Sequence, residues 1–349
     1  MVVSTLDRAV RAARSSAMLA GYWGRLGYGA TMSTLSHLAR PSYVEEAVPG
    51  AVDLESARRI AVMIHYDSGG VVHEYVHYYL AQLQDVGFAT IFVTNGPAPS
   101  APDRDRVLRV CARLIRRRNV GYDFGGWKEG IAAVPDLTRL DQLLIANDSV
   151  YGPFHHVGDL VDRMSPMEAD VWGMTDSWDR RYHLQSYFML FHGAALQAPG
   201  FADFWRRLRY IQSKTWVIRR YEIGLTRAML AANLRVKALY PYRMCAAALA
   251  DAVIQHGALG DQVDATRQDY IRMLYRLIIA GRPVNSTHFF WDYLIANMGF
   301  PFIKRELLQR NPAHIPLLTY WERVVRENSI YDTSLITRHL EMRNKNRVF

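Results

Sequence analysis

From residue 59 onward, the sequence alternates between short apolar runs and longer segments with apolar residues at helical spacing. The short runs are rich in β-branched and aromatic residues and predict strands at 59–65, 88–94, the end of 137–146, 170–175 and 186–191. The periodic segments predict helices at 71–86, 201–217 and 223–233, and one with Val107, Leu108, Cys111 and Leu114 on one face. This order is typical of an α/β fold with a Rossmann-type, mostly parallel sheet flanked by helices.

The same pattern divides the chain into three parts. Residues 1–57 look helical and then loose, and are predicted to form an N-terminal helical arm. Residues 58–240 hold the alternating strands and helices. Helical spacing then dominates, with a polar and aromatic interruption at 285–290, which predicts a helical C-terminal region at 241–349.

Three of the predicted strands end in polar clusters, at 65–67, 95–96 and 147–149. In open α/β sheets, ligands bind beyond the carboxyl ends of the strands. One shared cleft is therefore expected, with Asp148 delivered to it by a buried strand. Local chemistry leaves an alternative open, in which the triplet at 147–149 is an Asx-turn or a helix cap.

The composition is that of a folded globular protein with a large core, since 50% of the 349 residues are hydrophobic. Cys111 and Cys245 are too few for a disulfide framework or a Cys-based zinc site, which favours a reducing cytosol. No apolar run reaches the length of a signal peptide or a membrane span, so the chain is expected to be neither secreted nor integral.

A formal net charge of +9 predicts an anionic partner, either nucleic acid, a phosphorylated substrate or a membrane surface. Basic residues gather within 204–221, where no acidic residue occurs and three aromatic side chains lie between them. This segment is either a solvated helix face or a contact for phosphates and anionic headgroups. No nucleic-acid partner is expected, because the basic residues belong to no recognisable module.

The triplet at 147–149 also suits a divalent cation. A carboxylate at a strand end, with neighbouring oxygens and a diphosphate, is a ligand set that Mg²⁺ and Mn²⁺ accept. Asp148 is flanked by Asn147 and Ser149, which makes this signal weaker than an Asp-x-Asp triplet.

Residues 73–77 match the H-E-x-x-H pattern of zinc proteases, with His73 and His77 one helical turn apart. A third protein ligand is required. No glutamate lies between Glu74 and Glu129, and no histidine lies between His77 and His155. An ordinary helix that packs on the sheet is therefore favoured.

The glycines of residues 121–126 lack the context of a dinucleotide fingerprint, because a basic stretch precedes them and not the first strand of a βαβ unit. They are expected to allow close backbone approach in a loop. Asn119 and Asp123 would then be available to ribose or base, and Lys128 to a phosphate. Turn chemistry alone also produces such loops.

Two further residues carry candidate chemistry. Glu222 is the first carboxylate after Asp203 and lies at the predicted start of a helix, where it is either a general base or a carboxylate favoured by the helix dipole. His183, in a polar entry to a strand, is either a ligand-binding residue or a structural histidine.

Taken in order, these segments resemble the rhamnan synthesis protein F family, bacterial enzymes associated with rhamnose-containing polysaccharides. The matching stretches lie within residues 58–325 and are HYD at 65–67, VTNGP at 93–97, RNVGYDFGGWK at 118–128, ANDSVYGP at 146–153, VWGMTDS at 171–177, HLQSYF at 183–188, YEIGLT at 221–226, NSTHFFW at 285–291 and GFPFIK at 299–304. An ordered set of matches is more specific than a single motif.

The resemblance implies a GT-A-like fold and a glycosyltransferase, by family a rhamnosyltransferase. Such an enzyme moves a sugar from a nucleoside diphosphate sugar, here dTDP-L-rhamnose, to a growing surface polysaccharide such as a lipopolysaccharide O-antigen, or to a lipid-linked glycan, with inversion. The alternative is a non-catalytic nucleotide-sugar- or glycan-binding subunit of a polysaccharide assembly complex, which would tolerate the loss of Glu222.

The resemblance also implies roles for single residues. The triplet at 147–149 takes the place of the usual Asp-x-Asp, so Asp148 is expected to be catalytic and to hold Mg²⁺ or Mn²⁺, unless a basic cluster neutralises the diphosphate. Glu222 resembles the base of inverting enzymes. The residues expected at the nucleotide sugar are His65, Asp67, Asn95, Asn119, Gly121, Asp123, Lys128, Asn147 and Ser149. Those expected at the acceptor are Asp176, His183, Gln185 and Ser186.

A lipid-linked acceptor implies a cytoplasmic protein that is peripheral on the cytoplasmic face of the inner membrane. The N-terminal segment with Arg8, Arg11 and Arg14, and the basic residues of 204–221, would then rest on anionic lipid.

Overall fold

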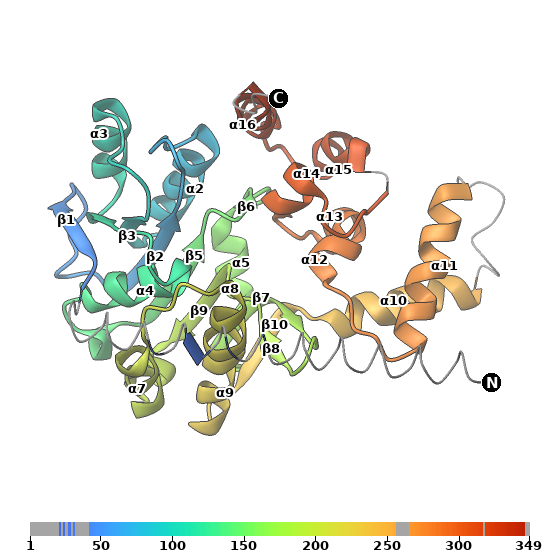
Figure 1. The fold of residues 1–349 in the computed structure, drawn as a ribbon, viewed down its shortest axis with the longest axis horizontal. Coiled ribbons are helices and arrows are strands. Elements are labelled where there is room, and N and C mark those ends of the chain that lie inside the picture. The colour runs from blue at the N-terminus through green and yellow to red at the C-terminus, as the bar shows by residue number, and fades with distance from the viewer. Residues whose placement is uncertain are drawn as a thin grey trace.

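The computed structural model describes residues 42–255, 265–316 and 318–345, together with isolated positions between 21 and 31. The strands of its main sheet are β1 (Val44–Pro49), β2 (Arg59–His65), β3 (Ala89–Thr94), β4 (Arg113–Arg117), β5 (Gln142–Asn147), β7 (Val171–Ser177), β8 (His183–Leu184), β9 (Phe188–His192) and β10 (Val236–Tyr240). Their order is β1-β4-β3-β2-β5-β9-β7-β10, and β8 pairs with β7 (Figure 1). β1, β8 and β9 run against the other strands. The prediction of an α/β fold with a mostly parallel sheet is confirmed.

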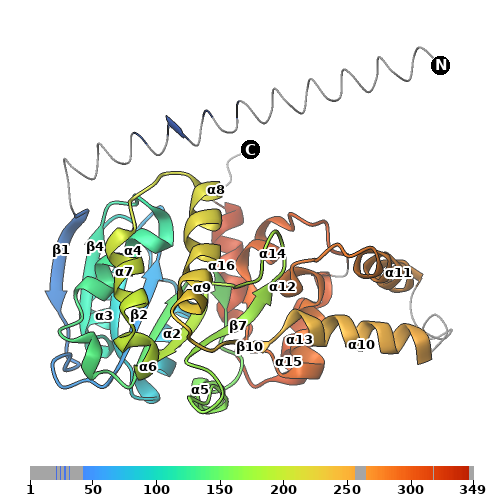
Figure 2. The ribbon, with the colours of Figure 1, turned by 90° about the horizontal axis from the view of Figure 1, so that it is seen from below.

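Helices cover both faces of this sheet (Figure 2). One face packs against α2 (Glu74–Asp85), α3 (Ala101–Val110) and α5 (Val157–Arg163). The other packs against α4 (Tyr122–Ala132), α6 (Gly193–Gln197), α7 (Pro199–Arg207) and α9 (Ile223–Ala231), the last of which follows α8 (Lys214–Val217). The C-terminal region holds α10 (Tyr242–Gln255), α11 (Ala265–Ile279), α12 (Ser286–Phe289), α13 (Trp291–Met298), α14 (Arg305–Arg310), α15 (Trp321–Asn328) and α16 (Ser334–Lys345).

The two covered faces follow from the sequence of the inner strands, which are almost continuous apolar runs. Successive side chains in a strand point to opposite faces. In β2, Ala61 and Met63 join the core on one face, and Ile60, Val62 and Ile64 join the core on the other. Burial on both sides fixes the position of the strand ends, where the polar residues begin.

Helix α4 lies very close to β2. A Cβ at Gly126 would stand 2.8 Å from Ile64 Cδ1, and one at Gly130 would stand 2.3 Å from Val62 Cγ1. The prediction of close backbone approach is confirmed, whereas the prediction of a loop is wrong, because the glycines after residue 121 lie in the helix. The close packing brings Asp123, in the first turn of α4, to the carboxyl ends of the strands.

The predicted helix with Val107 and Leu108 is found as α3, but it ends at Val110. The prediction that this helix reaches Leu114 is wrong, because Leu114 lies in the next strand. β4 pairs in parallel with β3, and Leu114 and Ile115 are buried there. β1 pairs antiparallel with β4, so the stretch 44–49 is an edge strand and not the loose chain predicted for it. Both strands depend on pairing between distant segments, which outweighs local propensity.

Three other segments of the C-terminal half differ from the predictions. The predicted helix 201–217 is interrupted at 208–213, where the Tyr210 hydroxyl donates to Glu129 (2.7 Å). β10 has no counterpart among the predicted strands and pairs in parallel with β7. The predicted interruption at 285–290 contains the short helix α12. Tertiary contacts override weak local preferences in each case.

The C-terminal region returns to the sheet at one place. A two-residue strand, β11 (Ile303–Lys304), pairs antiparallel with β6 (Val150–Tyr151), which directly follows the end of β5. α16 packs against α2, and His339 Nδ1 lies 2.8 Å from the Tyr151 hydroxyl. Residues after 300 therefore lie beside the strand ends, while the boundaries at 57 and 240 stay predictions.

Two expectations concern membranes. Among the described helices, none combines the length and the apolar character needed to cross a bilayer. The N-terminal segment with Arg8, Arg11 and Arg14 lies outside the described residues.

Candidate functional site

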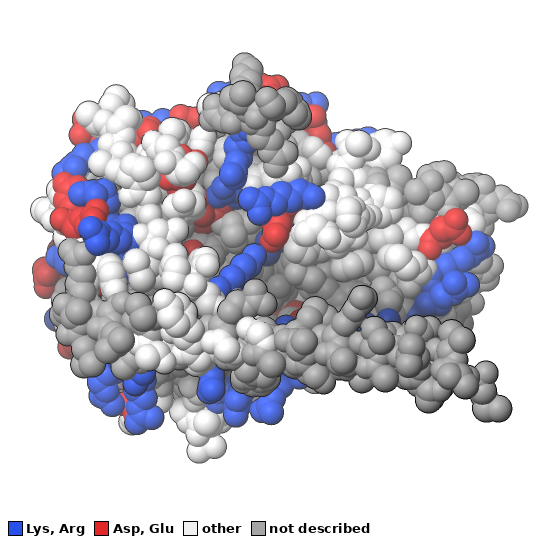
Figure 3. All heavy atoms as spheres, viewed as in Figure 1, with Lys and Arg blue, Asp and Glu red and all other residues white. Residues whose placement is uncertain are grey.

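A cavity of about 600 Å³ lies beyond the carboxyl ends of β2 and β5. It is lined by seven residues predicted for the site: Asp123, Asn147, Asp148, Ser149, Gln185, Ser186 and Glu222. Lys214 from α8 and several side chains from the C-terminal region also line it: Asn285, His288, Lys304, Arg305, Glu306, Gln309 and Arg310. Basic side chains gather in the middle of the face shown in Figure 3, between the sheet and the C-terminal helices. The predicted cleft is thus present, although the strand ending at 95–96 does not line it.

Asp148 lies directly after β5 and is held by its neighbours on β2 and α14. Its amide N donates to the Ile64 carbonyl (3.0 Å), and the Tyr66 amide N donates to its Oδ2 (3.4 Å). Arg305 Nη1 lies 2.6 Å from the same Oδ2 and 2.7 Å from the Asp148 carbonyl oxygen. Both side chains are 11% exposed, so the pair is nearly dry. The buried negative charge of Asp148 is therefore already compensated by a protein cation.

The two alternatives for the triplet at 147–149 are both realised in part. Asn147 Oδ1 accepts hydrogen bonds from the Ser149 amide (3.2 Å) and hydroxyl (2.6 Å), which is an Asx-turn. Asn147 Nδ2 donates to Asp123 Oδ2 (2.9 Å) in the cavity wall. Burial, with the nearby charge of Asp148, raises the pKa of Asp123 to about 6. The Asx-turn therefore positions Asn147 and Ser149 in the cavity wall, so the turn and the polar cavity wall occur together.

Lys304 brings a second cation to the cavity wall. Its Nζ lies 3.7 Å from the centre of the Tyr187 ring and 3.4 Å from Ser149 Oγ. Burial lowers the pKa of Lys304 to about 8, against the opposite effect of Glu222 and Asp123. No ion pair of Lys304 occurs among the described residues. At neutral pH this lysine is still mostly charged, and its charge is free to meet an anion.

Glu222 is oriented by Ser186. Its Oε1 accepts hydrogen bonds from the Ser186 amide (3.1 Å) and hydroxyl (2.9 Å). The residue ends a π-helical turn, Ile218–Glu222, between α8 and α9, so the backbone is helical on both sides of it (Figure 2). Glu222 does not stand at a free helix N-terminus, and π-helical turns often accompany functional sites. The interpretation of Glu222 as a carboxylate stabilised by a helix N-terminus is therefore wrong.

A second cavity, of about 350 Å³, adjoins the first. The two share Gln185, Glu222 and Asn285 in their walls, and His183 lines the second. Gln185 Nε2 donates to Asn285 Oδ1 (3.4 Å), and its Oε1 accepts from the Thr175 hydroxyl (2.6 Å). Glu222 therefore stands at the boundary between two adjoining cavities.

The structure does not bring His65 and Asp67 into the main cavity. The His65 ring is buried, with Nδ1 3.1 Å from the Thr94 hydroxyl. The Asp67 carboxylate accepts from the Gly69 amide (2.8 Å), and its pKa lies well below the usual range through the hydrogen bonds of His73 and this turn. At this strand end, only Tyr66 lines the cavity.

The predicted residues Asn95, Asn119 and Gly121 also lie outside the main cavity. Asn95 Oδ1 accepts from Arg117 Nη1 (2.7 Å), a buried contact between the ends of β3 and β4. The Asn119 carbonyl and the Gly121 amide are both bound by the side chain of Gln212 (3.1 and 3.0 Å). These polar groups hold the loop before α4 in place. This agrees with the alternative that turn chemistry explains this stretch.

Lys128 and Asp176 likewise point elsewhere. Lys128 Nζ donates to the carbonyl of Leu208 (2.5 Å), so it ties α4 to the chain after α7. Asp176 Oδ1 accepts from the Tyr242 amide (2.6 Å) and lines a different cavity, beside β10. Lys128 lies two residues, or about half a helical turn, from both Gly126 and Gly130, so its side chain is on the face of α4 that points away from β2.

The H-E-x-x-H match forms the ordinary helix that was favoured. His73 and His77 lie near different aspartates, at 3.6 and 3.5 Å, and Glu74 pairs with Arg106 (2.6 Å). Within the described residues, no group of three or more His, Cys, Asp or Glu side chains could hold a metal ion.

No role was predicted from the sequence for Lys304, Arg305, Asn285 or His288. All four line the main cavity. Residues 285–291 and 299–304 are among the stretches that resemble the family, so a signal was present. The position of Lys304 and Arg305 beside residues 148–149 depends on the pairing of β11 with β6, which no local pattern indicates.

Comparisons with known proteins relate the chain to one family and to several relatives. A family model described as rhamnan synthesis protein F matches residues 90–254. Virulence protein VirA of Vibrio anguillarum is 31% identical over 219 residues, which cover 61% of this chain and 67% of that protein. Protein y4gN of Sinorhizobium fredii is 31% identical over 186 residues, or 52% of this chain and 48% of that protein. The solved structure of the glycosyltransferase GlyE from Streptococcus pneumoniae TIGR4 has a TM-score of 0.35 at 10% identity, over 82% of this chain and 64% of that chain.

The matched residues include the end of β5, the loop with Ser186 and the helix with Glu222, which together form one wall of the main cavity. They lie within the stretch 58–325 over which the sequence resembles the family. The chain belongs to the rhamnan synthesis protein F family.

Proposed function

We propose that this chain is an inverting glycosyltransferase that moves a sugar from a nucleoside diphosphate sugar to a hydroxyl group of a growing glycan. Membership in the rhamnan synthesis protein F family supports glycosyltransferase activity of the nucleotide-sugar type. One observation carries the mechanism. Glu222, with one carboxylate oxygen fixed by Ser186, lines a cavity together with the cations Lys304 and Arg305.

In the proposed step, the acceptor hydroxyl oxygen attacks the anomeric carbon while the bond from that carbon to the diphosphate oxygen breaks. The hydroxyl proton passes to Glu222. Its Oε1 is held by Ser186, and its Oε2 accepts no hydrogen bond from the described residues. The nucleoside diphosphate leaves with the electron pair of the broken bond, and positive groups of the cavity stabilise its charge. Attack from the side opposite the leaving group inverts the anomeric carbon.

The two adjoining cavities support separate places for donor and acceptor. Asp123 and Asn147 supply oxygens and an amide for donor hydroxyls in the main cavity. His183 and Gln185 line the adjoining cavity, where we propose that the acceptor sugar binds. Glu222 belongs to both walls, which is the position that a base between the two substrates requires.

For the donor we propose dTDP-L-rhamnose, on the family's association with rhamnan synthesis. The test is to incubate the purified chain with dTDP-L-rhamnose, other nucleoside diphosphate sugars and a saccharide acceptor, and to record the product by nuclear magnetic resonance. We expect release of dTDP and a glycosidic bond of configuration opposite to that of the donor. A product with retained configuration would contradict the mechanism, and binding without transfer would favour the non-catalytic subunit.

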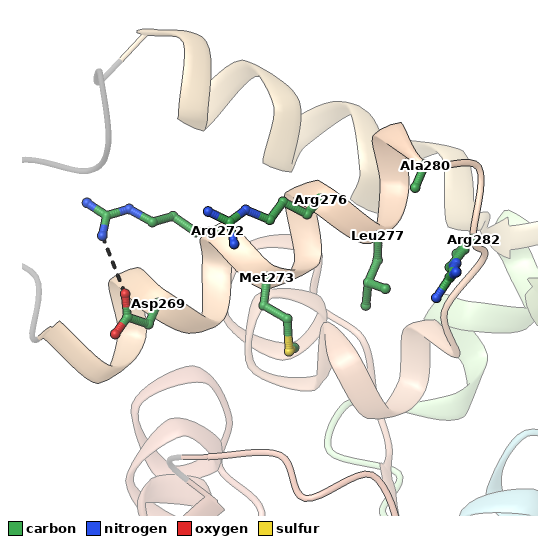
Figure 4. Close-up of a pocket in the computed structure, with 7 residues that line it drawn as sticks. All are labelled: Asp269, Arg272, Met273, Arg276, Leu277, Ala280 and Arg282. Atoms are coloured by element: carbon green, nitrogen blue, oxygen red, sulfur yellow. Dashed lines mark hydrogen bonds and ion pairs between the residues drawn. The ribbon is translucent and has the colours of Figure 1, made fainter. Parts of the chain in front are cut away.

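The acceptor is proposed to be lipid-linked, with the protein peripheral on the cytoplasmic face of the inner membrane. The exposed side of α11 supports this proposal (Figure 4). Arg272, Arg276 and Arg282 surround a surface hollow of about 500 Å³ that Met273 and Leu277 also line. No ion pair of Arg276 or Arg282 occurs in the part of the chain that the structure describes. An arginine-rich surface with exposed apolar side chains suits an anionic bilayer.

Arg282 is followed directly in the chain by Pro283, Val284 and Asn285, which line the proposed acceptor cavity. We expect the purified protein to sediment with liposomes that contain phosphatidylglycerol, and not with liposomes of phosphatidylcholine alone, at low salt. Reversal of two charges in an R276E/R282E variant should weaken this binding about tenfold or more. An R323E variant on α15 is the control. Equal sedimentation with both kinds of liposome would refute the proposal.

A further inference from the structure

A divalent cation at Asp148 does not fit the residues around it. Asp148 Oδ2 is already paired with Arg305 Nη1 at 2.6 Å and bound by the Tyr66 amide. The neighbouring amide oxygen of Asn147 accepts both donors of Ser149. Within the described residues, no group of three or more His, Cys, Asp or Glu side chains gathers around Asp148 to hold Mg²⁺ or Mn²⁺. A metal ion bound at Oδ2 would have to displace a guanidinium group of like charge.

We infer that Lys304 and Arg305, at the junction of β11 and α14, bind the diphosphate of the donor in place of a divalent cation. The inference rests on the proposed function, since it concerns how the same cavity holds its leaving group. It assigns a binding role to a dipeptide that lies after residues 90–254, which the family model matches, and that no sequence motif for phosphate binding includes.

The position of the dipeptide is fixed by backbone pairing. Lys304 pairs with Val150 in the β11–β6 ladder, and the Arg305 amide donates to the Ser149 carbonyl (3.0 Å). The segment is therefore bound to the residues that follow Asp148, and both cations are delivered to the same wall as the end of β5. Such fixed charges need little reorganisation when negative charge develops on a leaving group.

Lys304 and Arg305 both have hydrogen-bond donors that no described residue uses. Lys304 Nζ contacts only the Ser149 hydroxyl and the face of Tyr187 among the described residues. Arg305 uses Nη1 for both of its hydrogen bonds to Asp148. Its Nη2 and Nε make no hydrogen bond within the described part of the chain. A diphosphate with several acceptor oxygens matches one point charge and one planar fork.

Asp148 gains a different task under this inference. It orients the Arg305 guanidinium by accepting a hydrogen bond from Nη1, and it compensates the buried charge of Arg305 before the donor arrives. Without this carboxylate, the guanidinium would bear an uncompensated desolvation cost. The carboxylate after β5 then acts on the diphosphate through Arg305, and not through a metal ion.

The test is titration calorimetry of the full chain with dTDP, in buffer with EDTA and in buffer with Mg²⁺ or Mn²⁺. We expect equal affinity in all three buffers. A K304M variant should bind dTDP about tenfold or more weakly, which is the scale of a hydrogen bond between charged groups. K304R should restore most of the affinity because it restores the charge. K237M, which removes an exposed lysine of β10, is the matched control.

The outcomes separate this inference from the proposed function. Binding of dTDP that requires Mg²⁺ or Mn²⁺, or that is unchanged in K304M, would overturn the cation inference and leave the transferase intact. Absence of dTDP binding in every buffer would overturn both. Thermal unfolding of each variant is recorded beside the titration, and loss of binding in a variant that unfolds early is decided by K304R, which keeps the cation.

Discussion

A Glu222→Gln variant is expected to transfer sugar about a hundredfold or more slowly than the wild-type chain, and to bind the donor equally well. The amide oxygen of glutamine can still accept the two hydrogen bonds from Ser186, so the geometry of the cavity wall is kept. The amide cannot take up a proton from the acceptor hydroxyl. The rate constant kcat should therefore fall while the Kd of the donor stays constant, as measured by dTDP release and by calorimetry.

The matched control is Glu168→Gln, which neutralises a surface glutamate that pairs with Lys237. It should leave both the transfer rate and donor binding unchanged. A transfer rate of Glu222→Gln close to that of the control would remove Glu222 from the mechanism. Loss of donor binding in Glu222→Gln would instead assign this carboxylate to substrate binding.

An Arg305→Met variant is expected to lower the free energy of unfolding by about 3–5 kcal/mol, because it leaves the Asp148 carboxylate buried without its partner. The two side chains are each 11% exposed, and their closest atoms are 2.6 Å apart. Water therefore screens the remaining charge poorly. Chemical denaturation, followed by circular dichroism, measures the change.

A double-mutant cycle separates the ion pair from the packing of Arg305. We expect the Asp148→Asn and Arg305→Met double variant to be more stable than Arg305→Met alone, since the unpaired charge is gone. An Arg323→Met change in α15, at a pair that is 66% and 65% exposed, should cost about 1 kcal/mol or less. If Arg305→Met costs no more than this surface control, Asp148 and Arg305 do not form the buried pair described above.

The parallel core of the fold could be predicted from the sequence because its strands are buried on both faces. The β-branched residues of the run 59–65 predict a strand, which is found as β2. The edge of the sheet was harder. β4 is an arginine-rich segment whose strand character depends on its backbone pairing with β3 and β1, and on burial of Leu114 and Ile115 on opposite faces of the sheet. That pairing is not visible in a local window.

The site could be predicted where a side chain follows a buried strand or enters one. Asp148, Ser186 and Glu222 line the main cavity, as the strand ends and the family resemblance suggested. The residues expected around 119–128 were assigned to a loop, whereas α4 turns Lys128 toward the carbonyl of Leu208. Helical periodicity decides which residues share a face, so a wrong element type misdirects a whole group of side chains.

The positions of Lys304 and Arg305 could not be predicted from the order of residues along the chain. They reach the cavity through a two-residue ladder with β6, and Lys304 contacts Ser149, which is 155 residues earlier in the chain. Nothing in their own neighbourhood indicates a phosphate site. The resemblance marked residues 299–304 without giving them a role. Only the three-dimensional pairing assigns them to the wall that holds Asp148.

The most direct test of the central claim is a transfer assay of the full chain, with labelled nucleoside diphosphate sugars and a lipid-linked glycan fraction as acceptor. The wild-type chain and Glu222→Gln are compared side by side after both are shown to bind dTDP. We expect that the wild-type chain moves labelled sugar to the glycan and that Glu222→Gln does so about a hundredfold more slowly. Absence of transfer by the wild-type chain from every donor, or equal transfer by both proteins, would contradict this claim.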